Sequence, residues 1–534
     1  MSFKQPSRRA FLRATGIPIA GGLSGLPLLA SPRPLLPNRG GGLPAGGEDS
    51  LPIEVENGAS PSVRVKEAVL FPFDDHSIPF TWCLRLQLNV GKKMGRYNPI
   101  VVRCGQPSEP DNLSVRYYGT VIQVGDELRM WYMGAGDKMK LKGGHFIPLY
   151  AVSKDGIKWE KPKLGLIEYN GSKQNNILDL MGGEYGISEF VVIHEPEDPD
   201  PSRRFKMVFE SSKHQNRLAV AFSPDGLRWT ESSKNPLASG LEESGLIKYN
   251  GCYYVNGQGG GQYGSGRKMT TFASYDFERW TTATALSFRR GPSVELPVDQ
   301  WNCLEEVHLG ASLIGRGNVI LGIYGMWHGV PTGDRGWITM DLGFIVSNDA
   351  LHFREPIPDF RFVPCFEELE IPQGRPPSLA QGQGMANIGD KTLYWYEAWG
   401  TGQVRLATWD RDRLGYFCVF ENPATNPYSR SLPASLISCP MKLAREGGRV
   451  FINADGLSER AELRVELLDR EFKPIPGYTV QDCVPTRTSG FRQAVSWQGK
   501  ERLEAFPHPI RVRVAFGGER PEDVKLYALY VTSS

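Results

Sequence analysis

A short hairpin motif recurs along this chain and constrains its fold more than any other feature. Its fullest form is Ser-x-Asp-Gly-x-x-Trp, found at 153–159 and 223–229. Asp-Gly is a strong signal for a tight turn, the residues before the serine suit a strand, and the tryptophan anchors the return strand in a core. Further copies stand at 274–280, with Phe277 in place of the glycine, and at 347–353, and a weaker one begins at Thr408.

The copies are about 50 to 75 residues apart, and repeated units of this kind are typical of solenoids, propellers or arrays. Units built from strands favour a propeller, whose blades hold about four strands each. The alternative is a series of unrelated hairpins in one large β-sandwich. We therefore predict an all-β fold, with a five-bladed β-propeller followed by a C-terminal β-sandwich.

The predicted organisation has three parts. Residues 1–47 are expected to form an export signal and linker, 48–425 the propeller catalytic domain, and 430–534 the sandwich. Blade one is expected to begin near Val63, with a short strand at 69–75. In the last hundred residues Leu463, Val465 and Leu467 alternate with polar neighbours, which predicts strands with one buried face. We expect this domain to pack on the propeller rather than to bind sugar independently.

The N-terminal segment Ser-Arg-Arg-Ala-Phe-Leu-Arg, at 7–13, resembles the twin-arginine export signal, except that the family pattern usually ends in lysine. The apolar stretch at 14–30 is too short and too interrupted to anchor the chain in a membrane. The Pro- and Gly-rich residues 32–50 are typical of a linker. We therefore expect a periplasmic or secreted protein with no membrane anchor after signal removal.

The charge of the chain excludes some partners. Its 61 basic and 59 acidic residues give a formal charge of +2, and no basic stripe suggests nucleic acid. The eight cysteines form no CxxC pair and no zinc spacing, which favours free thiols, although Cys439 and Cys483 lie in one predicted domain and could pair.

Polar side chains stand near the start of the predicted first strand of each blade. Because the first strands line the axis of a propeller, these side chains are expected to converge on one funnel. Carboxylates that meet there raise each other's pKa, as paired acid and base work on a glycosidic bond requires. The candidates for catalysis are Asp111, Glu189, Glu243, Glu306 and His308, and those for substrate binding are Asp75, Arg116, His328 and Gln383. Each could instead be a solvated loop residue or a core residue.

Residues 118–121 (Tyr-Gly-Thr-Val), 130–132 (Met-Trp-Tyr) and the hairpin motif carry a family resemblance. Over 66–422 the chain resembles the five-bladed propeller glycoside hydrolases, namely the invertase and arabinanase-like clan and the neoagarobiose hydrolases. The resemblance implies Asp111, or Asp74 or Asp75 in its place, as base or nucleophile, Glu189 as a carboxylate that tunes a pKa, and Glu243 as the acid. The families' Asn-Asp-Pro-Asn and Arg-Asp-Pro motifs are absent.

The neoagarobiose type uses a histidine acid, which the resemblance places at His308. Glu306 and His308 lie two residues apart on a predicted strand and so share a face, where the carboxylate could hold the imidazole protonated. Tyr118, Trp327 and Trp395 could stack on a sugar or belong to the core.

These features predict an exported glycoside hydrolase that acts on a poly- or oligosaccharide. A non-catalytic glycan-binding propeller is one alternative, and a phosphorylase or lyase on the same scaffold is another. A phosphorylase would need a basic phosphate cradle in the funnel. No cofactor is required by the predicted chemistry, although a structural or funnel-bound divalent cation such as calcium would suit the acidic side chains.

Overall fold

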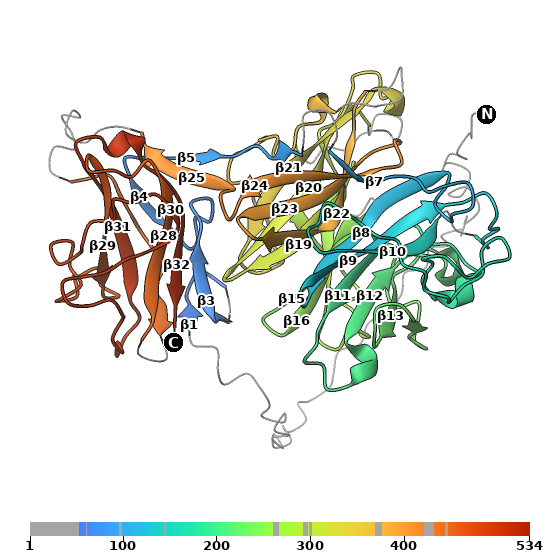
Figure 1. Ribbon diagram of the computed structural model, residues 1–534, viewed down its shortest axis with the longest axis horizontal. Helices are drawn as coiled ribbons and strands as arrows, with labels where there is room; N and C mark the ends of the chain where they lie inside the picture. Colours follow the sequence, from blue (N-terminus) through green and yellow to red (C-terminus); the bar gives the residue numbers. More distant parts are fainter. Residues whose placement is uncertain are drawn as a thin grey trace, which may run out of the picture. The chain divides into compact units, whose positions relative to one another are not determined.

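The computed structural model describes residues 53–533, except 60, 95–98, 144–145, 260–265, 292–296, 298–301, 369–375, 421–431 and 444–446. This part of the chain consists of strands joined by loops and contains no α-helix (Figure 1). Its helical elements are short 3-10 turns, among them η2 (Met181–Gly183), η3 (Pro201–Arg203), η4 (Ser212–His214), η6 (Arg335–Trp337), η7 (Cys365–Glu367) and η8 (Pro521–Asp523). No described helix is long and apolar enough to span a bilayer. The predicted export signal lies outside the described residues and stays a prediction.

Five groups of antiparallel strands follow one another along the chain and form the predicted blades, and those of blades one and five are joined in one eight-stranded sheet. Blade one is β8 (Ser114–Val124), β9 (Glu127–Ala135) and β10 (Ile147–Ser153). Blade two is β11 (Phe190–His194), β12 (Phe205–Phe209), β13 (Ala219–Ser223) and β14 (Thr230–Glu231). Blade three is β15 (Glu242–Tyr249), β16 (Cys252–Gly259), β17 (Lys268–Ser274) and β18 (Ala285–Phe288). Blade four is β19 (Glu306–Arg316), β20 (Val319–His328) and β21 (Thr339–Ser347), and blade five is β22 (Leu379–Ile388), β23 (Lys391–Ala398) and β24 (Val404–Asp410).

The first strands of the blades form a closed ring. Each contacts the first strand of the next blade, and β22 of blade five returns to β8 of blade one. These last two strands run parallel and pair at Gln383 and Thr120. The predicted five-bladed propeller is therefore confirmed.

Two short N-terminal strands extend the last blade. Both β6 (Lys92–Lys93) and β7 (Ile100–Val102) pair with β24. Blade five thus contains strands that precede blade one in the sequence and strands that follow blade four. This combination closes the ring.

The repeated hairpin motif adopts the turn that its residues predict. The Ser153 hydroxyl accepts a hydrogen bond from the Gly156 N–H (2.8 Å), and the Asp155 carboxylate accepts from the next two backbone N–H groups. Gly156 has φ +74°, a left-handed conformation that glycine adopts readily. Phe277 and Ala350 take the same conformation in the later copies, with φ of +68° and +64°.

The same turn joins adjacent blades. The indole of Trp131 in β9 donates to the carbonyl of Gly226 in blade two (2.7 Å), and Trp395 in β23 donates to Gly156 in blade one (2.8 Å). Both tryptophans are fully buried. The motif is therefore an inter-blade contact, and Trp395 belongs to the core rather than to a sugar-binding surface.

The C-terminal part forms two further sheets and a small third one. Its strands are β26 (Ser435–Ile437), β27 (Met441–Leu443), β28 (Arg449–Asp455), β29 (Ala461–Leu468), β30 (Gly490–Ala494), β31 (Arg511–Gly518) and β32 (Lys525–Thr532). As expected, Leu463, Val465 and Leu467 point into a common core. This arrangement agrees with the predicted sandwich.

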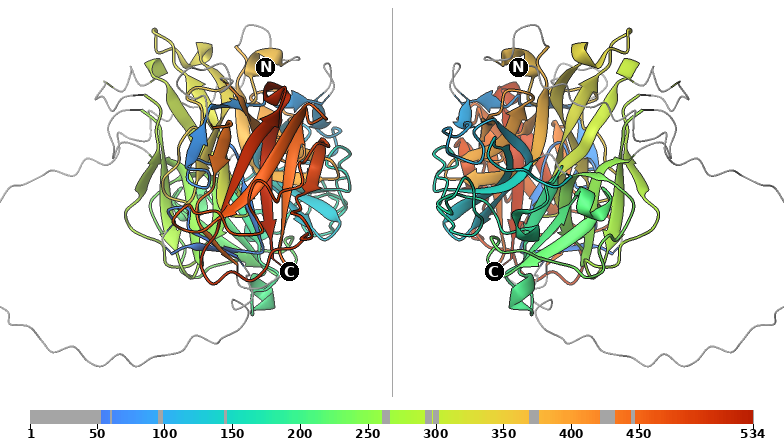
Figure 2. Two further views of the ribbon diagram at one scale, coloured as in Figure 1. Left: turned by 90° about the vertical axis from the view of Figure 1, so that its left-hand side faces the viewer. Right: turned by 90° about the vertical axis from the view of Figure 1, so that its right-hand side faces the viewer.

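Strands from the beginning of the described chain complete these sheets. They are β1 (Ile53–Val55), β2 (Val63–Val65), β3 (Glu67–Leu70), β4 (Phe80–Trp82) and β5 (Leu84–Leu88), and β25 (Gly415–Val419) joins them. β3 pairs with β32, β4 with β26, and β5 with β25, which also contacts β32. Figure 2 shows blue N-terminal strands beside the red and orange C-terminal ones.

The expectation that blade one begins near Val63 is therefore wrong for this segment. The sequence predicted a short strand at 69–75 that ends in acidic residues, but a strand segment does not by itself specify the strand with which it pairs. In the structure β3 ends at Leu70 and pairs with the last strand of the chain, with Leu70 opposite Leu529. All eight cysteines are free, so Cys439 and Cys483 do not pair.

Candidate active site

Two buried glutamines cross-link the first strands inside the ring. The Gln383 side chain accepts from the Leu246 N–H (2.6 Å) and donates to its carbonyl (3.0 Å), which joins blades five and three. The Gln381 amide donates to the carbonyl of His308 (2.6 Å) and to the hydroxyl of Ser244 (3.2 Å). Gln383, predicted to bind substrate, is therefore occupied in holding the strands together.

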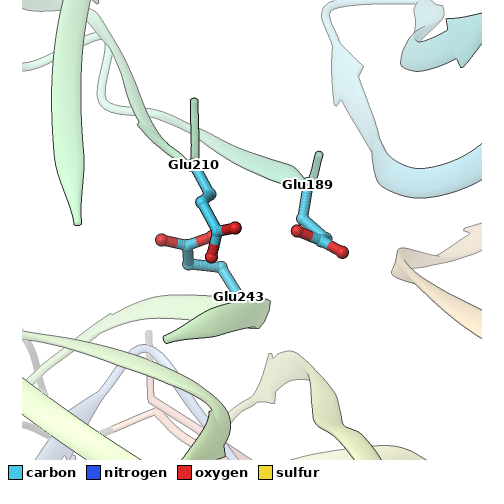
Figure 3. A group of neighbouring side chains, drawn as sticks. All are labelled: Glu189, Glu210 and Glu243. Carbon is cyan, nitrogen blue, oxygen red and sulfur yellow. The ribbon is translucent and has the colours of Figure 1, made fainter. Parts of the chain in front are cut away.

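Three glutamates from blades two and three form a compact cluster. Glu189 precedes β11 and Glu210 follows β12, so the two lie opposite each other across one strand pair, while Glu243 comes from β15. One carboxylate oxygen from each residue lies within 4.8 Å of the other two. Figure 3 shows the three carboxyl groups turned toward one another, with Glu243 facing Glu189 and Glu210.

The surroundings of Glu243 favour its protonated form. Its side chain is 1% exposed, and neither carboxyl oxygen has a hydrogen-bond partner among the described residues. Burial raises the pKa of Glu243 well above its usual value, and the carboxylates of Glu210 and Glu189 raise it further. These surroundings therefore favour the protonated form of Glu243.

Glu306, the first residue of β19 in blade four, has surroundings of the opposite charge. Its carboxylate lies 3.3 Å from the Arg267 guanidinium. Burial raises the pKa of Glu306 to about 7, while the positive charges of Arg267, Lys268 and Arg335 oppose that rise. Glu306 therefore changes between its two forms close to neutral pH.

His308 does not behave as the sequence suggested. Its ring lies among Trp327, Trp399 and Tyr118, with centroid distances of 5.7, 5.6 and 6.3 Å. Burial lowers the pKa of His308 well below its usual value, and the guanidiniums of Arg267 and Arg335 lower it further. The expectation that Glu306 holds this imidazole protonated is not met, because burial and the two cations favour the neutral ring.

Arg116 and Tyr118 lie two residues apart in β8, beside charged groups of other blades. The Arg116 guanidinium lies 2.6 Å from the Glu397 carboxylate. Burial raises the pKa of the Tyr118 hydroxyl, and the charges of Glu397, Arg116, Glu189 and Arg335 act on it as well. The Tyr118 hydroxyl is thus influenced both by Glu189 of the glutamate cluster and by Arg335 of blade four.

Asp111 lies elsewhere. Its fully buried carboxylate accepts from the Tyr132 hydroxyl (2.8 Å) and pairs with the Lys161 ammonium (2.7 Å). Tyr132 belongs to the second strand of blade one and also accepts from Asn176, so this network lies within the blade. The structure gives Asp111 a packing role and does not bring it to the three glutamates.

Two other predicted substrate ligands are engaged in ion pairs. Asp75 is exposed and pairs with Arg354, in the loop that follows β21. His328, the last residue of β20, contacts the carboxylates of Glu305 (2.8 Å) and Asp341 (2.9 Å), which raise its pKa against the opposing effect of burial. Both contacts are typical of structural charge networks.

Sequence reasoning missed Glu210 and Arg267. The sequence analysis looked for polar residues at the start of the first strand of each blade. Glu210 instead follows the second strand of its blade, so that criterion did not select it. Glu210 lies opposite Glu189 because β11 and β12 pair antiparallel, with Phe190 opposite Phe209. The two apolar segments in the sequence could have indicated this pairing.

The glutamate cluster also has the chemistry of a cation site. Ca²⁺ binds carboxylate oxygens, and three of them lie close enough to share one ion. A bound cation would ionise Glu243, whereas the carboxyl cluster alone keeps it protonated.

Comparisons with known proteins found no matching family model and no matching curated protein. Similar solved structures do exist. One is described under the GH130 family of mannoside phosphorylases containing glycoside hydrolases that target β-1,2 mannosidic linkages in Candida mannan, at 16% identity over 61% of this chain and 95% of that chain, with a TM-score of 0.39. Another is a putative glycosidase from Bacteroides thetaiotaomicron, at 15% identity over 60% and 97%, with a TM-score of 0.41.

A third is a β-fructofuranosidase from Schwanniomyces occidentalis, at 11% identity over 83% of this chain and 99% of that chain, with a TM-score of 0.37. Identities and scores at this level do not carry function, so the functional proposal rests on the chain's own residues.

Proposed function

We propose that this protein is a glycoside hydrolase that cleaves a poly- or oligosaccharide by acid and base catalysis at the propeller axis. The observation that carries the proposal is the contrast between two glutamates on neighbouring inner strands. Carboxylates surround Glu243, and cations surround Glu306. Titratable pairs whose surroundings push their pKa values apart are suited to opposite roles in proton transfer.

Glu243 is the acid of the proposed mechanism. It holds its proton because it is buried and because Glu189 and Glu210 lie beside it. Glu189 therefore keeps the tuning role that the family resemblance gave it, and Glu210 shares that role.

Glu306 is the base, in place of Asp111. Its pKa of about 7 matches a general base that works near neutral pH. Gln381 binds the carbonyl of His308 and the hydroxyl of Ser244, and so holds the strand segments that carry Glu306 and Glu243 close together.

The reaction balances without a cofactor. Glu243 gives its proton to the glycosidic oxygen as the bond from that oxygen to the anomeric carbon breaks. Glu306 takes a proton from the water that adds to the anomeric carbon. The products are two sugars with free hydroxyl groups, and each glutamate regains its starting form by exchange with solvent.

Replacing the two glutamates separately tests this assignment. Glu243→Gln and Glu306→Gln are each expected to lower sugar release by about 10²–10⁴-fold on any substrate that the unmodified protein cleaves. The matched control is Glu168→Gln, which changes an exposed glutamate in a loop of the propeller. Azide added to Glu306→Gln provides a second readout, because a small anion can replace a missing carboxylate.

Full activity in Glu243→Gln would overturn the proposal. Glycan binding by the unmodified protein without sugar release across a broad panel would favour a non-catalytic binding protein. Activity measurements with EDTA and with calcium test whether the glutamate cluster binds a cation instead. Activity that EDTA removes and calcium restores would assign the cluster to a cation, whereas unchanged activity in EDTA is the expected result.

A further inference from the structure

A group of cations and aromatic rings adjoins Glu306 and is not used by the proposed acid and base. The Arg267 guanidinium lies 4.1 Å from the centre of the Trp327 ring, and the Arg335 guanidinium lies 5.7 Å from it. Arg335 also lies 5.4 Å from the Trp399 ring. Two guanidiniums from different blades thus meet at one pair of tryptophans.

The electrostatic effect of this group is positive. Arg267, Lys268 and Arg335 act on Glu306, and both arginines act on His308. Lys268 is buried, and Arg267 is mostly buried, so their charges are screened less than those of surface residues. An anionic group of a bound molecule would be attracted by this charge.

Two buried polar atoms here have no hydrogen-bond partner among the described residues. They are Nδ1 of His308, whose side chain is 3% exposed, and Nε1 of Trp327, which is fully buried. A buried N–H donor without a partner is uncommon in folded proteins. The indole N–H of Trp327 can donate to an oxygen of a bound molecule, and Nδ1 of His308 can donate or accept according to its tautomer.

The group has an open side that suits a sugar. Arg335 and Trp337 belong to the same 3-10 turn, η6, and Trp337 is 61% exposed. Trp399 is partly exposed as well. Exposed tryptophans offer flat apolar faces, while an arginine beside them offers the planar fork that binds a carboxylate or sulfate through two parallel hydrogen bonds.

We propose that Arg267, Arg335, Trp327 and Trp399 form a subsite for an oxyanion carried by the substrate, such as the carboxylate or sulfate of an acidic sugar. This inference rests on the proposed function, because it names the substrate class of the same site. Free inorganic phosphate has the same chemistry and is the second source of such an anion.

Calorimetric titration of the whole protein tests the subsite through binding alone. The probes are D-glucuronate, glucose 6-sulfate, inorganic phosphate and, as the neutral match, D-glucose. Glucuronate or the sulfated sugar is expected to bind at least about tenfold more tightly than glucose, and Arg335→Gln is expected to abolish that preference while leaving glucose binding unchanged. Arg335 is exposed, so its replacement leaves the fold intact.

Two variants serve as controls. Arg335→Lys keeps the charge without the fork and is expected to retain only part of the preference. Arg279→Gln removes an exposed arginine from the outer hairpin of blade three, where its side chain is 85% exposed, and is expected to change nothing.

The outcomes distinguish an acidic sugar from free phosphate as the source of the anion. They also distinguish a failure of the subsite from a failure of the proposed hydrolase function. Tight phosphate binding that Arg335→Gln abolishes, without a preference for acidic sugars, supports the oxyanion subsite and assigns it to free phosphate. Equal binding of glucuronate, sulfated glucose, phosphate and glucose, or no binding of any at tens of millimolar, overturns the subsite. Glu243→Gln is expected to bind glucuronate normally, so lost hydrolysis with retained binding leaves the subsite standing.

Discussion

The charges around a glutamate decide its role in this protein. Glu243 and Glu306 are both buried, and burial raises the pKa of each. Two carboxylates add to the rise at Glu243, while three cations oppose it at Glu306. Identical side chains on adjacent inner strands therefore differ in how strongly their surroundings favour the protonated form.

The pH dependence of activity should follow from Glu306. A base must be ionised, so kcat/KM is expected to fall as the pH drops through about 7, the pKa of Glu306. The measurement is a pH profile of kcat/KM for the unmodified protein and for Arg267→Gln. Removal of the guanidinium should move the acidic limb to higher pH, because one of the charges that favours the ionised form is lost. A limb that stays in place would contradict the assignment of Glu306 as base.

Glu306 should also make the stability of the fold depend on pH, and in the direction opposite to activity. The pKa of Glu306 is higher in the folded protein than the ordinary value of 4.5, so its contribution to stability is full below that value and is lost as the pH rises through about 7. Glu306→Gln carries no charge, and we expect it to unfold at a higher temperature than the unmodified protein above pH 7, with the difference shrinking toward pH 5. Thermal melts at several pH values measure this. A constant difference across pH would contradict it.

Part of the site could be predicted from residues alone. Glu189 and Glu243 were expected to converge because both stand at the start of a first strand, and they lie in one cluster. Asp111 satisfied the same rule, but Tyr132 and Lys161 engage it within blade one. The position of a residue along its strand predicts at which end of the propeller it lies. It does not predict which neighbouring side chains will bind it.

At the scale of elements, the hairpin motif is an example of a sequence repeat that carries structure rather than chemistry. The turn carbonyls of Gly156 and Gly226 each accept from an indole of the preceding blade around the ring. The motif could therefore predict the number of blades, because each copy marks one outer hairpin. It could not predict the inter-blade bond, whose donor lies on another blade.

Gly226 should tolerate a side chain worse than another turn glycine does. It has φ +81°, and an added Cβ would lie 2.8 Å from the Trp131 ring. Gly251 has φ +75° with no atom within 4 Å of such a Cβ. Gly251→Ala should cost about 1–2 kcal/mol for the left-handed backbone, and Gly226→Ala about 1–3 kcal/mol more because the buried indole must shift. Denaturant unfolding of both variants compares them, and equal losses would show that Trp131 moves freely.

At the scale of the whole molecule, the ends of the described chain meet. Blades four and five share a hydrophobic core with Val69, Phe71 and Tyr530, so propeller and C-terminal sheets are packed against each other. The sequence indicated both folds because each has its own strand pattern. It could not indicate that 53–88 supplies strands to the C-terminal sheets, because strand partners so distant in sequence leave no periodic signal.

Asn318 tests whether these parts unfold together. This buried residue lies in the turn between β19 and β20, accepts from the Val69 N–H (2.7 Å) and donates to the Ser77 hydroxyl (2.8 Å). Asn318→Ala leaves the Val69 N–H without its partner, which costs about 1–3 kcal/mol. Hydrogen exchange followed by mass spectrometry at moderate denaturant reports each strand separately, and we expect protection to fall by a similar free energy in β20 and in β32.

The control for this experiment is Asn112→Ala, which removes amide hydrogen bonds at the surface and should alter neither strand. A loss of protection confined to β3 and β32, with β20 unchanged, would mean that the C-terminal sheets open independently of blade four. Equal losses would mean that the N-terminal strands make propeller and C-terminal sheets one cooperative unit, because Val69 pairs with β32 on one side and with Asn318 on the other. The geometry of Glu243 and Glu306 would then depend on the last strand of the chain as well as on the blades that carry them.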